Sequence, residues 1–151
     1  MATPPNRELV AELLAATPEL TKDEVAVALE LFDAAVEGDE TYRLLFDFAG
    51  QDLRGYACYG PTPLTNATWD LYWIVVAQKH RRGGVGRKLI AQVEREIADA
   101  RGRLVRVETE SSEPYAATRA FYDSLDYERL ATIRDFYDEG RDLVLYGKYF
   151  R

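Results

Sequence analysis

The residues best suited to chemistry gather in one short segment, where basic side chains surround three glycines. The segment reads Arg81-Arg82-Gly83-Gly84-Val85-Gly86-Arg87-Lys88 and follows an apolar run that ends at Val76. Glycines let the backbone approach a ligand closely, because no Cβ stands in the way. The first N–H groups of the helix expected after this turn lack partners and lie at the positive end of its dipole. The segment therefore predicts a phosphate site; the plain alternative is a solvated, glycine-rich helix start.

Three kinds of phosphate-binding loop can be compared with this segment. A nucleotide P-loop needs a Lys and then a hydroxyl residue after its last glycine, and the residues that follow Gly86 do not supply them. A dinucleotide loop needs a third glycine where Leu89 stands, although Glu108 could serve as its ribose-binding acid. A Rossmann-type NAD(P)-binding oxidoreductase is therefore kept as an alternative. The third pattern is Arg81-x-x-Gly84-x-Gly86, which opens a helix a few residues after a strand.

The elements that must position this loop follow from hydrophobic spacing and turn residues. Thr21 and Glu24 form a predicted capping box at the start of the second helix. The order of elements gives an α/β (α+β) fold, a central mixed sheet with helices on both faces, in one domain over residues 1–151 with residues 1–6 frayed. Helices are expected over 7–16, 22–36, 85–100 and 114–125, and strands over 42–48, 53–59, 69–76, 104–109, 127–133 and 143–150.

Two of these elements carry finer predictions. The strand over 69–76 is apolar at its end, which predicts a central strand. Strict alternation along it places Asp70 on the same face as Val76, six residues later. The helix that begins at Pro114 is expected to bury Ala117, Phe121 and Leu125, and Asp135–Gly140 is expected to form the turn between the last two strands.

The Arg81-x-x-Gly84-x-Gly86 pattern resembles the pyrophosphate loop of the GNAT N-acetyltransferase superfamily, which binds acetyl-coenzyme A. The segment 118–127, with its Phe121-Tyr122 pair, resembles the family's second helix, and 53–59 resembles its hairpin strand. The similarity covers about residues 40–151. It implies a GNAT-like acyl-CoA acyltransferase fold and direct transfer of an acetyl group to a primary amine in a ternary complex. A non-catalytic acyl-CoA-binding module that regulates a partner is the second alternative.

The resemblance also implies roles for individual residues. Tyr122 corresponds to the phenol that protonates the leaving thiolate, whereas a core aromatic ring is the plain alternative for it. Asp70, or an ordered water, would take the proton of the amine; the alternative is a strand-end Asp held by turn amides. Asp135 and Tyr137, on the closing hairpin, would border the acceptor, and a solvated acidic hairpin is the alternative. The implied cofactor-binding residues are Ile74 and Val76, through their backbone groups, with Arg81, Arg82, Gly83, Gly84, Val85, Gly86 and Arg87 at the pyrophosphate.

Some positions depart from the family pattern. Asp126 stands where the family has a glycine after the second helix, and Asp can adopt the left-handed conformation, though less easily than Gly. Tyr115 stands where many members have an Asn that touches the cofactor arm, and Ser124 replaces a frequent Lys.

Composition limits the classes of protein that fit. Of 151 residues, 47% are hydrophobic and 30% charged, which is typical of a globular domain. The net charge of −7 argues against a nucleic-acid surface, and Cys58 with His80 alone gives no metal-ligand set. No apolar run is long enough to span a membrane, and the start lacks a signal-peptide pattern, so the cytoplasm is expected. The expected partner is a small-molecule or peptide amine; its identity, and whether the chain forms a homodimer, stay open.

Overall fold

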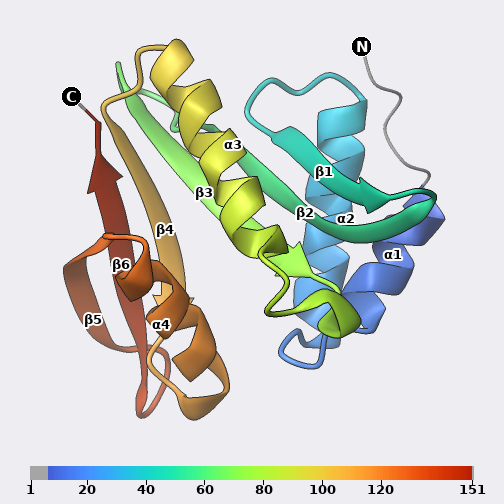
Figure 1. The fold of residues 1–151 in the computed structure, drawn as a ribbon. Helices are drawn as coiled ribbons and strands as arrows, with labels where there is room; N and C mark the ends of the chain where they lie inside the picture. The colour runs from blue at the N-terminus through green and yellow to red at the C-terminus, as the bar shows by residue number, and fades with distance from the viewer. Residues whose placement is uncertain (1–6, 151) are drawn as a thin grey trace.

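The computed structural model describes residues 7–150, and the predicted fraying of residues 1–6 lies outside this range. The order of elements is the one expected from the sequence, and the predicted fold class is confirmed (Figure 1). The helices are α1 (Arg7–Ala15), α2 (Lys22–Val36), α3 (Val85–Asp99) and α4 (Ala116–Ser124), with short 3-10 helices η1 (Gln78–His80) and η2 (Glu113–Tyr115). The strands are β1 (Arg43–Ala49), β2 (Asp52–Pro61), β3 (Thr68–Val76), β4 (Leu104–Glu110), β5 (Glu128–Asp138) and β6 (Arg141–Tyr149).

The strands form one six-stranded sheet in the order β1-β2-β3-β4-β6-β5. All neighbouring pairs are antiparallel except β3 with β4, which run parallel. A Rossmann fold requires a largely parallel sheet, so the dinucleotide-binding alternative is wrong.

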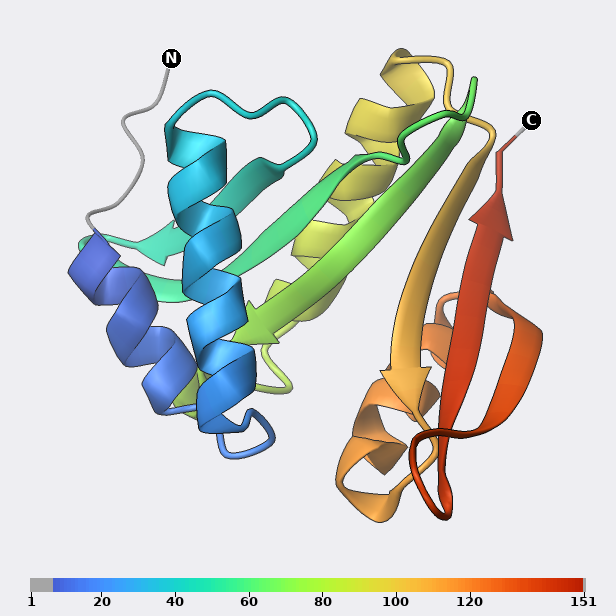
Figure 2. The same cartoon turned by 180° about the vertical axis from the view of Figure 1, so that it is seen from behind.

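The parallel pair separates soon after it begins. Only Thr68, Trp69 and Asp70 of β3 pair with β4, against Leu104–Arg106. Beyond these residues the two strands diverge, as Figures 1 and 2 show, and we call the opening between them the splay. The prediction that β3 is a central strand is therefore right only for its first three residues, because the apolar end of β3 has β2 as its single strand neighbour.

Helices cover both faces of the sheet and divide the core in two. Helices α3 and α4 lie on the face seen in Figure 1, and α1 and α2 lie on the face seen in Figure 2. Burial of one apolar stripe per helix stabilises this arrangement. The α3–α4 core includes Val93, Ile97, Val107, Tyr122 and Tyr146. The α1–α2 core includes Val10, Leu14, Phe32, Tyr56 and Cys58.

A β-bulge in β3 changes which face its residues occupy. Cys58 pairs with Trp73 and Tyr59 with Leu71, so Tyr72 has no partner on β2. Leu71 packs in the α3–α4 core, whereas Tyr72 and Trp73 both pack against the α1–α2 core. Because the bulge reverses the alternation, Asp70 lies on the α1–α2 side and Val76 on the α3–α4 side. The prediction that these two residues share a face is wrong.

Helix α4 is rotated relative to the sequence prediction. Tyr122 is its buried residue, at 3% exposure, while Phe121 and Leu125 are only partly buried and Ala117 is exposed. The left-handed conformation expected for Asp126 is found, with φ of 64°.

None of the helices within residues 7–150 is long and apolar enough to cross a membrane.

Candidate active site

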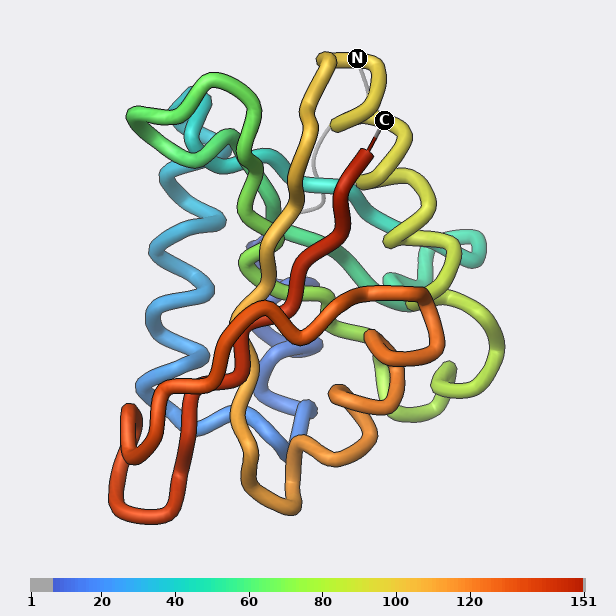
Figure 3. The backbone as a smooth tube through the Cα atoms, turned by 90° about the vertical axis from the view of Figure 1, so that its left-hand side faces the viewer, coloured from blue at the N-terminus to red at the C-terminus, as the bar shows by residue number. Residues whose placement is uncertain are grey.

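Four segments meet at the open end of the splay. They are the α1–α2 loop, the turn that precedes α3, the start of α4 and the turn of the β5–β6 hairpin, all at one end of the molecule (Figures 1 and 3). The predicted cofactor and acceptor residues lie on or near these segments, whereas Asp70 lies at the closed end of the splay.

The turn before α3 has the conformation that its glycines require. Gly84 is the N-cap of α3 and has a φ of 83°, a left-handed angle that favours glycine. An added Cβ at Gly84 would meet no atom within 4 Å, so the space beside it is open. The first helical hydrogen bond runs from the Lys88 N–H to the Gly84 carbonyl. The N–H groups of Val85, Gly86 and Arg87 therefore remain free of helix partners, as an anion site needs.

At Gly86, close packing of neighbouring side chains, and not backbone conformation, requires a glycine. A Cβ there would lie 3.3 Å from the ring of Phe121 and 3.7 Å from Val76 Cγ2. The missing side chain thus lets α3 pack closely against α4 and β3, rather than letting a ligand approach.

The basic side chains of this segment do not all surround one point. Arg81 forms a bidentate ion pair with Glu19, with N–O distances of 2.6 and 3.0 Å. Lys88 binds Asp47 on β1 at 2.9 Å. Arg87 donates to the Ser124 hydroxyl at 3.1 Å, and among residues 7–150 only Arg82 and Arg87 of this segment have no carboxylate partner. The sequence prediction grouped these cations, but the contacts leave two of them available to a phosphate.

The open edge of β3 carries backbone groups that no strand pairs. The Ala77 N–H bonds the Arg54 carbonyl on β2, so alternation directs the N–H and C=O groups of Ile74 and Val76 toward the splay. The Val76 carbonyl accepts a long hydrogen bond, 3.3 Å, from Arg81 Nε. An extended amide-bearing chain could pair with this edge as an added strand does.

Tyr122 is enclosed by other rings. Its ring centroid lies 5.3 Å from Phe121, 5.4 Å from Tyr127 and 5.7 Å from Tyr146. Burial raises the pKa of Tyr122, so its phenol stays protonated at neutral pH. Its hydroxyl has no hydrogen-bond partner within residues 7–150. Because this hydroxyl is not fully enclosed, unlike the buried hydroxyls of Thr109 and Tyr146, it is accessible to a ligand and suited to donate a proton to it.

Asp70 is buried and both of its oxygens are occupied. Oδ1 lies 2.6 Å from Arg106 Nε, and Oδ2 accepts from the Thr62 hydroxyl at 2.8 Å. Asp70 and Arg106 are the last paired residues before β3 and β4 diverge. The carboxylate thus ties the two strands together at the closed end of the splay.

The two residues predicted to border the acceptor amine, Asp135 and Tyr137, have different surroundings on the β5–β6 hairpin. Asp135 Oδ1 accepts from the Gly140 N–H at 2.9 Å, so this carboxylate stabilises its own turn. Strand β5 continues to Asp138, and the turn is shorter than the predicted Asp135–Gly140 because residues 134–137 form an irregular part of the strand. Tyr137 is 43% exposed; burial, with Glu108, Glu110 and Glu24 nearby, raises its pKa. Tyr137 therefore faces an acidic environment built by two other elements, β4 and α2.

Two residues near the splay were missed by the sequence prediction. Glu19 contacts Arg81 across 62 positions of sequence, and the Tyr115 hydroxyl contacts Glu19 across 96. No local sequence pattern reveals contacts between residues so far apart in the chain. The one available indication was that Tyr115 replaces the Asn found in many members of the family.

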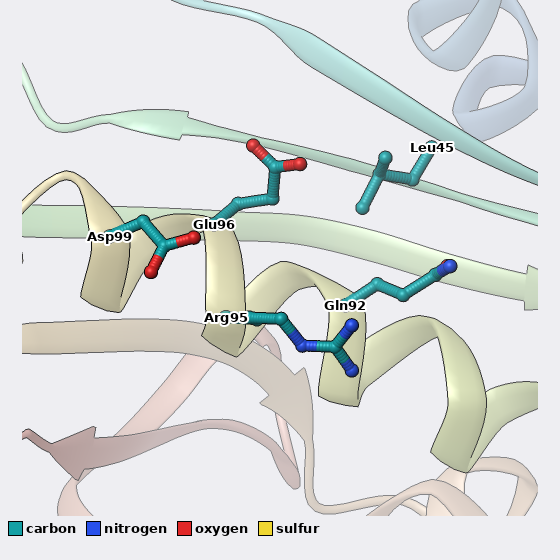
Figure 4. Close-up of a pocket in the computed structure, with 5 residues that line it drawn as sticks. All are labelled: Leu45, Gln92, Arg95, Glu96 and Asp99. Carbon is teal, nitrogen blue, oxygen red and sulfur yellow. The ribbon is translucent and has the colours of Figure 1, made fainter.

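A shallow pocket lies elsewhere, along the outer side of α3 against β1 (Figure 4). It is lined by Leu45, Gln92, Arg95, Glu96 and Asp99. Within residues 7–150, no three or more His, Cys, Asp and Glu side chains are grouped to hold a metal ion.

Comparison with known proteins identifies the protein family. A family model described as the acetyltransferase (GNAT) family matches residues 7–127. A crystal structure from Desulfovibrio desulfuricans, assigned to the GNAT family of acetyltransferases, is 36% identical, with 99% of this chain and 95% of that chain covered and a TM-score of 0.94. No curated protein matches the chain significantly.

More distant structures share the fold. An aminoglycoside 6'-N-acetyltransferase solved with coenzyme A is 18% identical, with 95% and 89% of the chains covered and a TM-score of 0.76. The ribosomal-protein-S18-alanine N-acetyltransferase of Escherichia coli is 16% identical, with 98% and 90% covered and a TM-score of 0.76. The protein is thus an acyltransferase. Within that class the chain belongs to the GNAT family, and it is an N-acetyltransferase.

Proposed function

We propose that the protein transfers the acetyl group of acetyl-coenzyme A directly to a primary amine. The observation that carries the proposal is the continuity between the open edge of β3 and the free N–H groups at the start of α3. A coenzyme A molecule has an amide-bearing arm joined to a pyrophosphate, and this arrangement offers a complementary surface to each part. The D. desulfuricans relative and the neighbour solved with coenzyme A support the proposal.

Each part of the cofactor has its proposed residues. The backbone groups of Ile74 and Val76 hold the arm and orient the thioester. The N–H groups from Arg82 to Arg87, which include Gly83, Gly84, Val85 and Gly86, hold the pyrophosphate, with Arg82 and Arg87 adding charge. Arg81, whose guanidinium is bound to Glu19, supports this turn from its other side.

The chemistry is a displacement at the thioester carbon. The amine nitrogen forms a bond to that carbon, and the carbon–sulfur bond breaks. Tyr122 gives its hydroxyl proton to the departing sulfur and regains one from solvent. The proton of the amine goes to Asp70 or to an ordered water; the Arg106 and Thr62 contacts of Asp70 favour the water.

The amine is proposed to enter from the α1–α2 side, because the cofactor fills the α3–α4 side. There Tyr137, beside Glu24, Glu108 and Glu110, borders the path with an aromatic ring and negative charge. A cationic amine gains from both. Asp135 supports this rim by holding the hairpin turn.

A thiol-release assay with acetyl-coenzyme A across a panel of amines tests the function. The panel includes an aminoglycoside, a polyamine, free amino acids, and peptides with an N-terminal Ala or an internal Lys. Thiol release that depends on an amine, with the acetylated amine seen by mass spectrometry, is expected. Direct transfer predicts no burst of thiol when the amine is absent, and Asp70→Asn should retain most of the turnover if water is the base.

Failure of every amine, together with no binding of coenzyme A, would remove the proposal. Binding without turnover would instead favour the regulatory module. The cytoplasmic location expected from the sequence is part of the proposal, and cell fractionation with an antibody tests it.

A further inference from the structure

The α1–α2 loop contacts both sides of the splay. On the β3 side, the Glu19 carboxylate holds Arg81, and this contact keeps the pKa of Glu19 below its ordinary value. On the β4 side, the Tyr115 hydroxyl lies 3.3 Å from the Glu19 carbonyl oxygen and 3.4 Å from Glu24 Oε2. We call Glu19, Arg81 and Tyr115 the clasp.

The loop that carries Glu19 is itself fixed. The Thr17 hydroxyl donates to the Leu13 carbonyl at 2.8 Å, and the Leu20 N–H donates to the Thr17 carbonyl at 3.2 Å. Directly after the loop, Thr21 and Glu24 form the capping box of α2, with both hydrogen bonds at 3.1 Å. Because hydrogen bonds hold both ends of the loop, the position of Glu19 relative to Arg81 and Tyr115 is fixed.

The contact with Arg81 reaches the edge where the cofactor arm is proposed to lie. Arg81 Nε donates to the Val76 carbonyl, so the guanidinium that Glu19 holds also occupies the last open carbonyl of β3. The arm is then left with the groups of Ile74 and the N–H of Val76. Arg81 thus defines where the hydrogen-bonding edge ends.

The contact with Tyr115 spans the opening. Tyr115 ends η2 and precedes α4, the helix that carries Tyr122. Burial, with Glu24 nearby, raises the pKa of Tyr115 to about 12, so its hydroxyl stays a donor at neutral pH. Asp70 and Arg106 join the strands at the closed end of the splay, and the clasp joins the two sides at the open end.

We propose that Glu19 is a positioning residue for acetyl transfer, which through Arg81 and Tyr115 fixes the width of the splay around the cofactor arm. This inference rests on the proposed function. It assigns Arg81 to the arm rather than to the pyrophosphate, and so separates it from Arg82 and Arg87. It also gives Tyr115 a function that does not require contact with the cofactor.

The test compares coenzyme A with pantetheine, which has the arm but no phosphate. Dissociation constants are measured by calorimetry for coenzyme A and by NMR titration for pantetheine. Glu19→Ala should weaken both ligands by about tenfold, because it disturbs the arm. Glu19→Gln keeps the shape and one of the two acceptor oxygens that Arg81 uses, but it loses the second acceptor and the charge, so its effect should be smaller than that of Glu19→Ala. Arg82→Ala should weaken coenzyme A alone.

Further variants separate positioning from a general loss of structure. Tyr115→Phe removes only the hydroxyl and should weaken both ligands, while Glu19→Ala with Arg81→Ala should cost little more than either change alone. Unchanged affinities in Glu19→Ala, or a loss confined to coenzyme A as in Arg82→Ala, would overturn the inference. If the unaltered protein bound neither ligand, the proposed function itself would fail.

Discussion

Tyr122 and Phe121 are adjacent aromatic residues with separate functions. Phe121 fills the space that Gly86 leaves open and so joins α4 to α3. Tyr122 lies deeper, against Tyr127 and Tyr146, with a hydroxyl that has no partner in the described part of the chain. Packing explains the buried ring, whereas the hydroxyl is not fully enclosed and so remains able to meet a ligand.

Tyr122→Phe is therefore expected to separate chemistry from binding. Turnover should fall by roughly 10²–10⁴-fold, because the leaving sulfur loses its proton donor, while the affinity for coenzyme A changes little. Steady-state kinetics and calorimetry measure the two effects. Tyr127→Phe is the matched control, since that ring also contacts Tyr122 but its hydroxyl is directed to Glu94, 3.4 Å away. Equal turnover of Tyr122→Phe and the unaltered protein would make Tyr122 a core residue only.

At the scale of elements, the cofactor turn can be tested through its backbone. Gly84→Val should abolish measurable coenzyme A binding, because a β-branched side chain resists a φ of 83° and fills the open space beside α3. Gly140→Val is the matched control. Gly140 has a φ of 77° and no atom within 4 Å of an added Cβ, but it lies in the β5–β6 turn. Both variants should lose similar stability by urea unfolding, and only Gly84→Val should lose coenzyme A in calorimetry.

The same elements show what the sequence could and could not predict. Periodicity and caps are local, so the Thr21–Glu24 capping box, the start of α3 at Val85 and the order of elements along the chain were predicted correctly. The bulge at Tyr72 was not predicted, because it depends on how β2 and β3 pair. This one extra residue places Asp70 on the opposite face from the one expected. The extent of the splay could not be predicted from local patterns either, because it depends on contacts between distant segments.

Charge partners were harder to predict than elements. The sequence shows four cations near Gly84, but it does not show that Glu19 and Asp47 neutralise two of them. The same holds for Asp135, whose carboxylate was expected at the acceptor and instead binds the Gly140 N–H. A charged side chain has many potential partners, and only the folded arrangement selects among them.

As a whole molecule, the protein has two parts that β3 and β4 join over three residue pairs. Each part has its own buried carboxylate. Asp47 binds Arg54 at 2.6 Å and Lys88 at 2.9 Å in the β1–β3 part. In the β4–β6 part, Glu110 binds Arg141, with one N–O distance of 3.0 Å, and accepts from Ser112. Hydrogen bonds from Arg141 hold the pKa of Glu110 below its ordinary value.

These carboxylates predict how the molecule responds to acid. Burial alone would raise the pKa of Asp47, but hydrogen bonds from Arg54 and Lys88 outweigh it and hold the pKa below its ordinary value. As the pH falls, the unfolded chain therefore binds a proton first. The stabilisation is complete above the ordinary pKa of about 4 and is lost as the pH falls through the lower value in the folded state. Charge repulsion is a second, general effect: it falls as the pH drops from 7 toward the isoelectric point near 4.8, and it rises again below that point as the chain becomes positive.

Asp47→Asn distinguishes the two effects. At pH 7 the variant should be less stable by about 1–3 kcal/mol, because Arg54 and Lys88 lose a buried carboxylate that joins β1 to β2 and α3. Near pH 2 the difference should shrink, because the unaltered protein has then lost the same interactions. Urea unfolding followed by circular dichroism across this pH range measures both values. Asp99→Asn, at an exposed position of α3, is the control and should follow the unaltered protein at every pH. A difference between Asp47→Asn and the unaltered protein that is as large in acid as at pH 7 would mean that Asp47 stabilises the fold by packing and not by its charge.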